Sequence, residues 1–279
     1  EIKSLMNNFI VKFHKLINDI YAQTGIAIII IFLILIIFQS YLPSPFEQNL
    51  GNRLSKIGEN GHVLGSDQFG RDQLSRLIYG AKISITVGFL SSIITLIIGV
   101  LIGSIAGYYG GKADAFLMRI TDMIMGFPSL LLLIALSSAM NPGINTVIIS
   151  IGLTSWTGIA RTIRSQVFTI KTEEYISAAK SLGYSNIKIL INHILPNCFG
   201  LIMISFTLSI SGAIMAEASL SFLGLGVQPP VPSWGIMISE GKDFFRVAPR
   251  LSLLPGLTTI LAVLSINLLG EALRDLLEP

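Results

Sequence analysis

The chain has 279 residues, of which 52% are hydrophobic and 13% are charged, and its formal net charge is +3. Because a water-soluble domain carries about 25% charged residues, this composition excludes one and indicates an integral membrane protein. The mild positive charge comes without a stripe of basic and aromatic residues, which argues against nucleic acid as a partner.

The first predicted span covers residues 20–42. No charge lies between Asp19 and Glu47, and about 20 apolar residues suffice to cross a bilayer. No small-residue cleavage site follows, so we expect a retained anchor rather than a signal peptide. Residues 1–19 precede this span as a segment predicted to be cytoplasmic.

Residues 43–82 are polar and rich in glycine, and they predict an extracellular loop. The second part of this loop, Asp72 to Ile83, carries apolar residues at helical spacing. This pattern favours a short helix lying on the membrane surface. The remaining residues, 83–279, then form a core with five further spans.

The second span is expected from Ile83 to about Gly107, where the spacing of Gly99, Gly103 and Gly107 is typical of closely packed helices. The next uncharged stretch has 38 residues, positions 123–160, which is enough for the third and fourth spans.

The turn-forming sequence Asn141-Pro142-Gly143 divides these two spans. The fifth and sixth spans are expected at about 199–220 and 251–269. The Gly/Pro-rich stretch 222–250 between them is too broken for a spanning helix. Pro128 and Pro255 predict kinks in the third and sixth helices.

Six spans place both termini on the same side of the membrane. With that side taken as cytoplasmic, its segments hold eleven of the nineteen basic residues, a weak positive-inside signal. The polar insert at residues 171–197 is then cytoplasmic.

The insert predicts two short helices joined by a glycine. Thr172 is the expected N-cap of the first helix, which runs from Tyr175 to Leu182 and ends at Gly183. A second helical run, 186–194, is expected to end at Pro196. Since Ala178 and Ala179 leave one face small, the pair of helices is suited to fit a groove on another protein.

No sequence motif for chemistry is present. Gly111-Lys112 resembles the end of a phosphate loop, but Ala106 and Ala113 stand at two of its required positions. We therefore expect no nucleotide, and no other cofactor, to be bound by this chain. The three histidines and the single cysteine, Cys198, are too scattered for a metal site.

No catalytic residue is expected either. Asp122 and Glu217 are the acidic residues nearest to the spans, and they are not placed as a catalytic pair. Asp122, one turn after Arg119, is expected to form an interfacial ion pair. A carboxylate such as Glu217 in an apolar helix either lines or gates a pore, or pairs structurally with neighbouring groups.

The insert resembles the EAA loop of the membrane subunits of ABC importers, whose pattern is E-A-A-x-x-x-G, nine residues, then I-x-L-P. The matching residues are Ala178, Ala179, Gly183, Leu195 and Pro196. Ser177 stands at the glutamate position and His193 at the isoleucine position. The resemblance implies that the insert couples to an ATPase, with Glu173 or Glu174 in place of the missing glutamate.

Other segments resemble the "C"-type permease subunits of the dipeptide/oligopeptide/nickel importers. These segments are His62 to Gly80, Ser219 to Gly235 and Asn267 to Asp275. This resemblance implies an all-α, polytopic, six-span permease of the type I importer fold, located in the cell membrane.

The implied partners are a second homologous permease, two ATP-binding subunits that hold ATP and Mg²⁺, and an extracellular substrate-binding lipoprotein. Oligopeptides or dipeptides are the expected substrates, and nickel or a metal chelate is the alternative. A secondary transporter driven by an ion gradient and a membrane-embedded enzyme are the competing classes.

Overall fold

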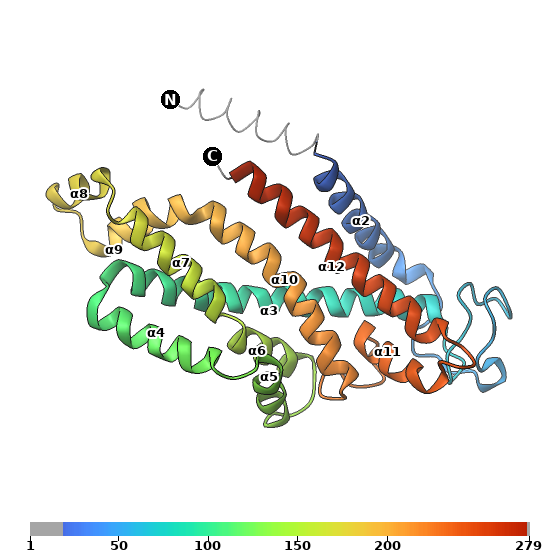
Figure 1. Cartoon of the computed structure of the whole chain (residues 1–279). Helices are drawn as coiled ribbons and strands as arrows, with labels where there is room; N and C mark the ends of the chain where they lie inside the picture. Colours follow the sequence, from blue (N-terminus) through green and yellow to red (C-terminus); the bar gives the residue numbers. More distant parts are fainter. Residues whose placement is uncertain (1–18, 278–279) are drawn as a thin grey trace.

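The computed structural model describes residues 19–277, so residues 1–18 of the predicted N-terminal segment lie outside the described part. The described residues are helical and form no β-strand. Five of the described helices are long and apolar enough to cross a membrane, and the number rises to six when a bent helix pair is counted as one span. The predicted all-α, six-span fold is therefore confirmed (Figure 1).

The helices have the following bounds: α2 Ile20–Ile37, α3 Gln73–Tyr109, α4 Gly111–Met125, α5 Ser129–Ser138, α6 Ile144–Thr154, α7 Thr157–Ile170, α8 Glu174–Ser181, α9 Asn186–Ile189, α10 Phe199–Phe222, α11 Trp234–Gly241 and α12 Arg250–Leu277. Asp19 caps α2, because its carboxylate accepts hydrogen bonds from the backbone of Tyr21 and Ala22.

Helix α3 is the central helix of the bundle, and α6, α7 and α10 pack against it. It has 37 residues, about 55 Å at 1.5 Å per residue, whereas the hydrocarbon core of a bilayer is about 30 Å thick. The separate surface helix expected at Asp72 to Ile83 is therefore wrong, since those residues form the first turns of α3. Gln73 and Arg76 in these turns are buried by the loop before α3 and by α11, rather than lying flat on a membrane.

Helix α7 packs along α3 on the glycine stripe that the sequence indicated. A Cβ atom at Gly99 would lie 2.7 Å from the side chain of Ile159, and one at Gly107 would lie 2.6 Å from the backbone oxygen of Arg164. Neither distance is compatible with a side chain, so the stripe brings the two backbones together. The packing interpretation of these glycines is confirmed.

The predicted break at residues 141–143 separates α5 from α6, and Pro128 marks a second break. Helices α4 and α5 are bent by 86° across the intervening residues, while α6 and α7 together form one span, Ile144–Ile170. Pro255 lies inside α12, in its second turn, and the helix continues through it.

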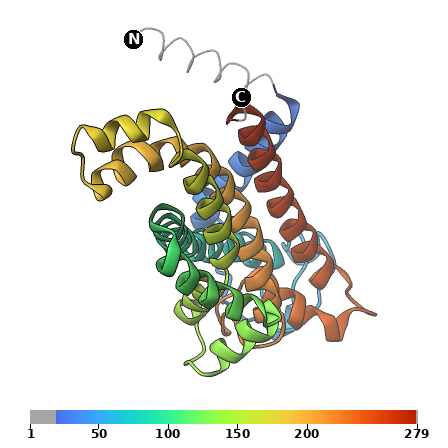
Figure 2. The ribbon, with the colours of Figure 1, turned by 60° about the vertical axis from the view of Figure 1, so that its left-hand side comes forward.

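The two ends of α3 carry different structures. The loop of residues 43–72 packs at its first turn, where Ser66 and Asp72 form an isolated antiparallel bridge. The insert packs at its last turn, where the Tyr108 hydroxyl donates to the side chain of Asn186 at 2.9 Å. Figure 2 shows α8 and α9, in yellow, projecting from the bundle. The loop and the insert thus lie at opposite ends of the molecule.

A buried ionic network fixes the loop at its end of the bundle. Arg71 Nε donates to Asp67 at 2.6 Å and Arg71 Nη2 donates to Glu240 of α11 at 3.1 Å. Arg76 of α3 donates to the same Glu240 oxygen at 2.7 Å. Such a network contributes more to fixed orientation than to net stability, because desolvation offsets much of its attraction.

Two further contacts anchor the same loop. His62 Nδ1 lies 2.8 Å from Asp72, whose other carboxylate oxygen caps α3 by accepting from the Ser75 backbone at 2.8 Å. Arg250, the first residue of α12, donates to the backbone oxygen of Ser55 at 2.6 Å. The loop residues that resemble the permease segment after the first span therefore hold the loop against the first turns of α3 and α12.

Candidate functional site

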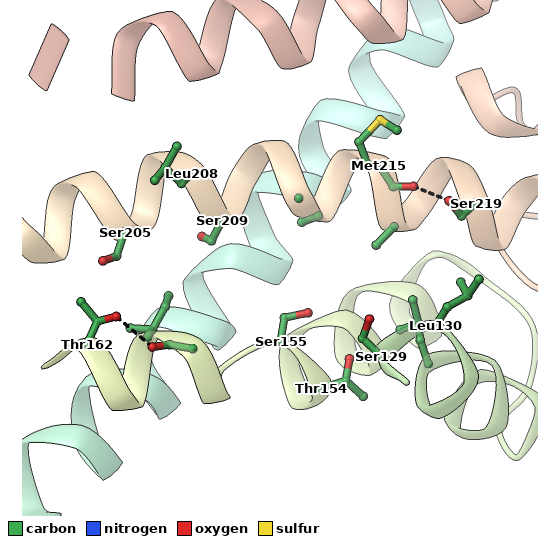
Figure 3. Close-up of a pocket in the computed structure, with 16 residues that line it drawn as sticks. Ser129, Leu130, Thr154, Ser155, Thr162, Ser205, Leu208, Ser209, Met215 and Ser219 are labelled. Atoms are coloured by element: carbon green, nitrogen blue, oxygen red, sulfur yellow. Dashed lines mark hydrogen bonds between the residues drawn. The ribbon is translucent and has the colours of Figure 1, made fainter. Parts of the chain in front are cut away.

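An open groove of about 630 Å³ runs along one face of the bundle. Helix α10 forms one wall, and α5, α6 and α7 form the other (Figure 3). Small residues make the groove wide: Gly158 of α7 and Gly212 of α10 have no atom within 4 Å of where a Cβ would be. The groove is therefore open to the surroundings of the bundle along its length.

The lining of the groove is uncharged and mostly apolar, with hydroxyl groups placed along it. Seven of its sixteen residues carry a hydroxyl group: Ser129, Thr154, Ser155, Thr162, Ser205, Ser209 and Ser219. Several of these hydroxyls donate to a backbone oxygen of their own helix, as Ser219 does to Met215 at 2.8 Å and Thr162 to Gly158 at 3.1 Å. Their protons are occupied, so their oxygens remain as hydrogen-bond acceptors.

Glu217 does not line this groove. It is 0% exposed and accepts hydrogen bonds from Ser84 of α3 at 2.8 Å and from Ser221 at 2.7 Å. In this structure the Glu217 side chain makes the structural pairing that was one of the two expectations, and the pore or gate role stays a prediction. The physical reason is that hydroxyl donors compensate the carboxylate inside the protein.

The insert has the predicted helix–glycine–helix form. Gly183 adopts φ +82, a conformation that favours glycine. The Gly183 N–H donates to Lys180 O at 2.9 Å and the Tyr184 N–H donates to Ala179 O at 3.2 Å. These two bonds are the Schellman motif, which satisfies the last carbonyls of α8. Gly183 is exposed, with open space around it.

The ends of the two insert helices differ from the prediction. Thr172 does not cap α8: Glu173 takes the N-cap position without a side-chain bond, and the Thr172 hydroxyl donates to Thr169 O. Pro196 does not stop the second helix. A π turn and a 3₁₀ turn carry the chain from α9 into α10, and Pro196 lies in the first turn of the 3₁₀ segment, where a missing N–H is tolerated.

The two adjacent alanines lie on different faces of α8. Ala179 is 6% exposed and packs inside the chain, whereas Ala178 is exposed. Neighbouring residues in a helix are about 100° apart, so they cannot share one face. The expectation of a small face built from both alanines is wrong. Glu174, Ser177 and Pro196 are also exposed, and Leu195 is partly buried.

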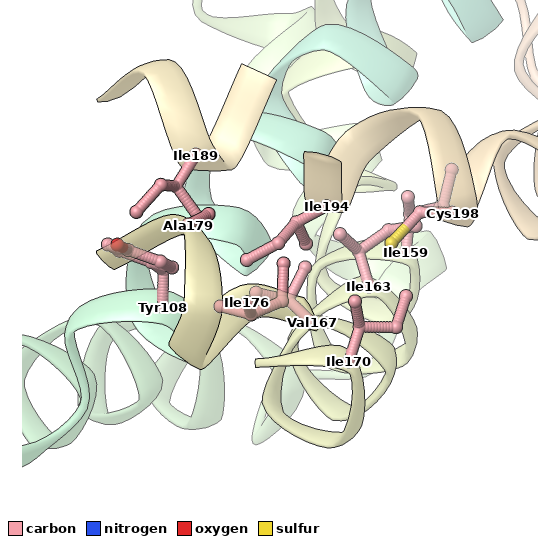
Figure 4. Close-up of a cluster of buried hydrophobic side chains, with 10 residues drawn as sticks. All are labelled: Tyr108, Ile159, Ile163, Val167, Ile170, Ile176, Ala179, Ile189, Ile194 and Cys198. Carbon is pink, nitrogen blue, oxygen red and sulfur yellow. The ribbon is translucent and has the colours of Figure 1, made fainter. Parts of the chain in front are cut away.

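A hydrophobic cluster joins the insert to the bundle. Ile176 and Ala179 of α8, Ile189 of α9 and Ile194 belong to one buried cluster with side chains of α3 and α7 (Figure 4). The full cluster is Tyr108, Ile159, Ile163, Val167, Ile170, Ile176, Ala179, Ile189, Ile194 and Cys198. The insert is therefore packed as an extension of α3 and α7.

The outer surface of the insert is unexpectedly apolar. Leu182 is 76% exposed and Ile187 is 64% exposed. Tyr175, Tyr184 and Ile191 are exposed on the same two helices and the turns beside them. We call these five residues the apolar tip. These five residues were not predicted as a docking surface, although large apolar residues in a polar insert were the available signal.

Ion pairs hold α4 against α7. Asp122 pairs with Arg161 of α7, so the expected ion pair exists but its partner is not Arg119. A second pair, which the sequence did not indicate, joins Asp114 to Arg164, with two nitrogen atoms of the guanidinium facing the two carboxylate oxygens. Among the described residues, no group of three His, Cys, Asp or Glu side chains could hold a metal ion.

The chain is similar in sequence to known membrane transport proteins. The model of the family described as "Binding-protein-dependent transport system inner membrane component" matches residues 99–279. The dipeptide transport system permease protein DppC of Alkalihalophilus pseudofirmus is 40% identical over 269 residues, 96% of this chain and 88% of that protein. The oligopeptide transport system permease protein OppC of Bacillus subtilis is 37% identical over 260 residues, 92% of this chain and 85% of that protein.

The fold also matches solved structures. An inward-facing structure of the MetNI methionine ABC transporter aligns with a TM-score of 0.61 and 16% sequence identity. The alignment covers 73% of this chain and 96% of that one. At this identity the likeness supports the fold.

Proposed function

We propose a function for this chain from one premise: it belongs to the binding-protein-dependent transport system inner membrane component family. It is therefore a multi-pass permease subunit of an ATP-driven importer in the cell membrane. Within that role, we propose that it forms, with a second homologous permease, the path along which dipeptides or oligopeptides cross the membrane.

The uncharged, hydroxyl-lined groove is the observation that carries this proposal. A peptide backbone offers many N–H donors, and the hydroxyl oxygens of the groove are acceptors. A path without fixed charge also lets peptides pass whatever the charge of their side chains. Nickel prefers imidazole, thiolate or carboxylate ligands, and none of the residues that line the groove supplies one.

The insert is the proposed docking element for the ATPase subunits, so its end of the bundle is cytoplasmic. Its apolar tip offers Leu182 and Ile187 for burial, and the exposed Glu174, Ser177 and Ala178 flank them. Gly183 holds the turn between the two helices. ATP and Mg²⁺ would be bound by the two partner ATPases, whose closure would move the insert as a rigid body.

The opposite end of the bundle is the proposed contact of an extracellular binding protein. There the buried network of Asp67, Arg71, Arg76 and Glu240 fixes the loop and α11 relative to α3. A pre-ordered outer surface of this kind loses little conformational entropy when a partner docks.

Uptake into proteoliposomes tests the proposal. The assembled importer, supplied with binding protein and internal ATP, should accumulate a labelled dipeptide, and unlabelled peptides should compete whereas Ni²⁺ should not. The chain alone should transport nothing with either ATP or an ion gradient. Competition by Ni²⁺ but not by peptides would refute the substrate, and transport by the lone chain would refute the shared path.

A further inference from the structure

The segment that joins α10 to α11 is bound to α10 around Glu217. Ser221 Oγ donates to one oxygen of this carboxylate at 2.7 Å, and Ser84 Oγ of α3 donates to the other at 2.8 Å. The carboxylate thus connects α10 with α3 inside the bundle.

The same two hydroxyls also bind the backbone of this segment. Ser221 Oγ accepts from the Val227 N–H at 3.2 Å, and Ser84 Oγ accepts from the Trp234 N–H at 3.3 Å. Because each hydroxyl has a single proton, donation to Glu217 leaves its oxygen free to accept these bonds. The carboxylate therefore orients two serines, and the serines orient the segment that begins α11.

Close packing makes this arrangement stiff. A Cβ at Gly226 would collide with Ser221, and a Cβ at Gly235 would lie 2.6 Å from Ala218 O of α10. The indole of Trp234 is fully buried, and its Nε1 donates to Leu77 O of α3 at 3.2 Å. No space remains for the segment to slide along α10.

The groove lies on the neighbouring side of α10. Ala216, the residue before Glu217, lines it together with Met215 and Ser219, and consecutive residues are about 100° apart around a helix. Glu217 is thus bound beside the wall of the groove. An apolar residue of similar size would fill the same space, but it would leave the hydroxyl protons of Ser84 and Ser221 without this acceptor.

We propose that Glu217 is a positioning residue for transport: through Ser84 and Ser221 it holds the outer half of α10 and the α10–α11 segment in one fixed orientation to α3, which sets the wall of the groove. This inference rests on the proposed function of the groove. It assigns a role to the segment resembling the permease loop before the last span, which the groove and the insert leave unexplained.

Variants of Glu217 in the assembled importer test this role. Glu217→Gln keeps the size of the side chain but offers one acceptor oxygen in place of two, and Ser84→Ala removes one donor. For both we expect a normal amount of assembled complex and about tenfold less labelled dipeptide carried per ATP hydrolysed, the effect of losing one buried hydrogen bond. Glu271→Gln, an exposed glutamate of α12, is the matched control and should behave as the unaltered protein does.

Three results would overturn the proposal. Unchanged coupling in both Glu217→Gln and Ser84→Ala would show that the hydrogen bonds are not used. Normal dipeptide transport per ATP hydrolysed in Glu217→Met would show that the side chain serves only to fill space. A lower amount of assembled complex, with normal dipeptide transport per ATP hydrolysed in the complex that forms, would show that Glu217 affects only stability.

A second measurement separates this inference from the proposed function. Spin labels on cysteines placed at Lys82 of α3 and at Leu223 after α10, in a Cys198→Ser background, report the orientation of α10 without any transport. We expect one narrow distance distribution that Glu217→Gln broadens, and an unchanged distribution would overturn the positioning role. Failure of the unaltered importer to take up dipeptide would instead refute the proposed function.

Discussion

Leu182 offers the most direct test of the docking element. It is the C-cap residue of α8, next to Gly183, and 76% of its surface is exposed. Truncation by Leu182→Ala removes no contact that the fold depends on. A loss of ATPase binding in this variant would therefore come from the interface and not from unfolding of the permease.

The size of the effect follows from this exposure. Complete burial of a leucine side chain contributes about 1.5 to 3 kcal/mol. With 76% of Leu182 still available for burial, docking it into a pocket of the ATPase is expected to contribute about 1 to 2 kcal/mol. Leu182→Ala should then weaken ATPase binding by about 5- to 30-fold.

The assay is a titration of purified ATPase subunits onto the permease pair in nanodiscs, followed by fluorescence. Leu50→Ala is the matched control, because Leu50 is 69% exposed and lies in the loop at the opposite end of the bundle. Binding by Leu182→Ala as tight as that of the unaltered chain would refute the docking role of the apolar tip. Equal weakening by Leu50→Ala would show that the effect is not local.

Other predictions concern packing, ion pairs and the groove. Gly103→Ala should lower the free energy of unfolding by about 1 to 3 kcal/mol, and with it the melting temperature in detergent, because the new Cβ collides with the backbone of α7. Gly212→Ala is the control: it has open space around it and should leave the melting temperature unchanged. Asp114→Asn should cost about 1 kcal/mol or less, since the pair with Arg164 is partly exposed, and exchanging the two charges should restore the melting temperature. Ser209→Asp places a negative charge in the groove, so it should slow uptake of anionic peptides relative to cationic ones while ATPase binding stays normal.

Composition was sufficient to predict the spans because burial in lipid requires long uncharged segments. The uncharged gaps of the sequence mark the spanning helices, although the bent pair α4–α5 and the span Ile144–Ile170 extend beyond them over charged residues. The glycine stripe of Gly99, Gly103 and Gly107 coincides with the α3–α7 contact. What this reasoning could not predict is where a helix continues beyond the membrane. Lys82 interrupts the hydrophobic pattern but not helix α3, because the backbone hydrogen bonds of a helix do not depend on which residues are charged.

The candidate site was predicted less completely, because motif spacing says nothing about which side of a helix is covered. The match to the EAA pattern located the insert and its glycine turn correctly, yet Ala179 belongs to the interior and Leu182 to the surface. Glu217 shows the same limit. An isolated carboxylate in an apolar helix indicates a polar neighbour, and only the folded chain brings Ser84, 133 residues away, to that position.

The structure connects the two proposed functional surfaces through one helix. Ile176 of the insert packs in the same cluster as Val167 and Ile163 of α7, and the cluster ends at Ile159, which lines the groove. Since protein interiors are close-packed and compress little, a displacement of the insert by a docked ATPase would displace α7 and with it one wall of the groove. The other wall, α10, is held to α3 behind the groove by Glu217. Movement of α7 relative to the outer half of α10 would change the width of the groove between them.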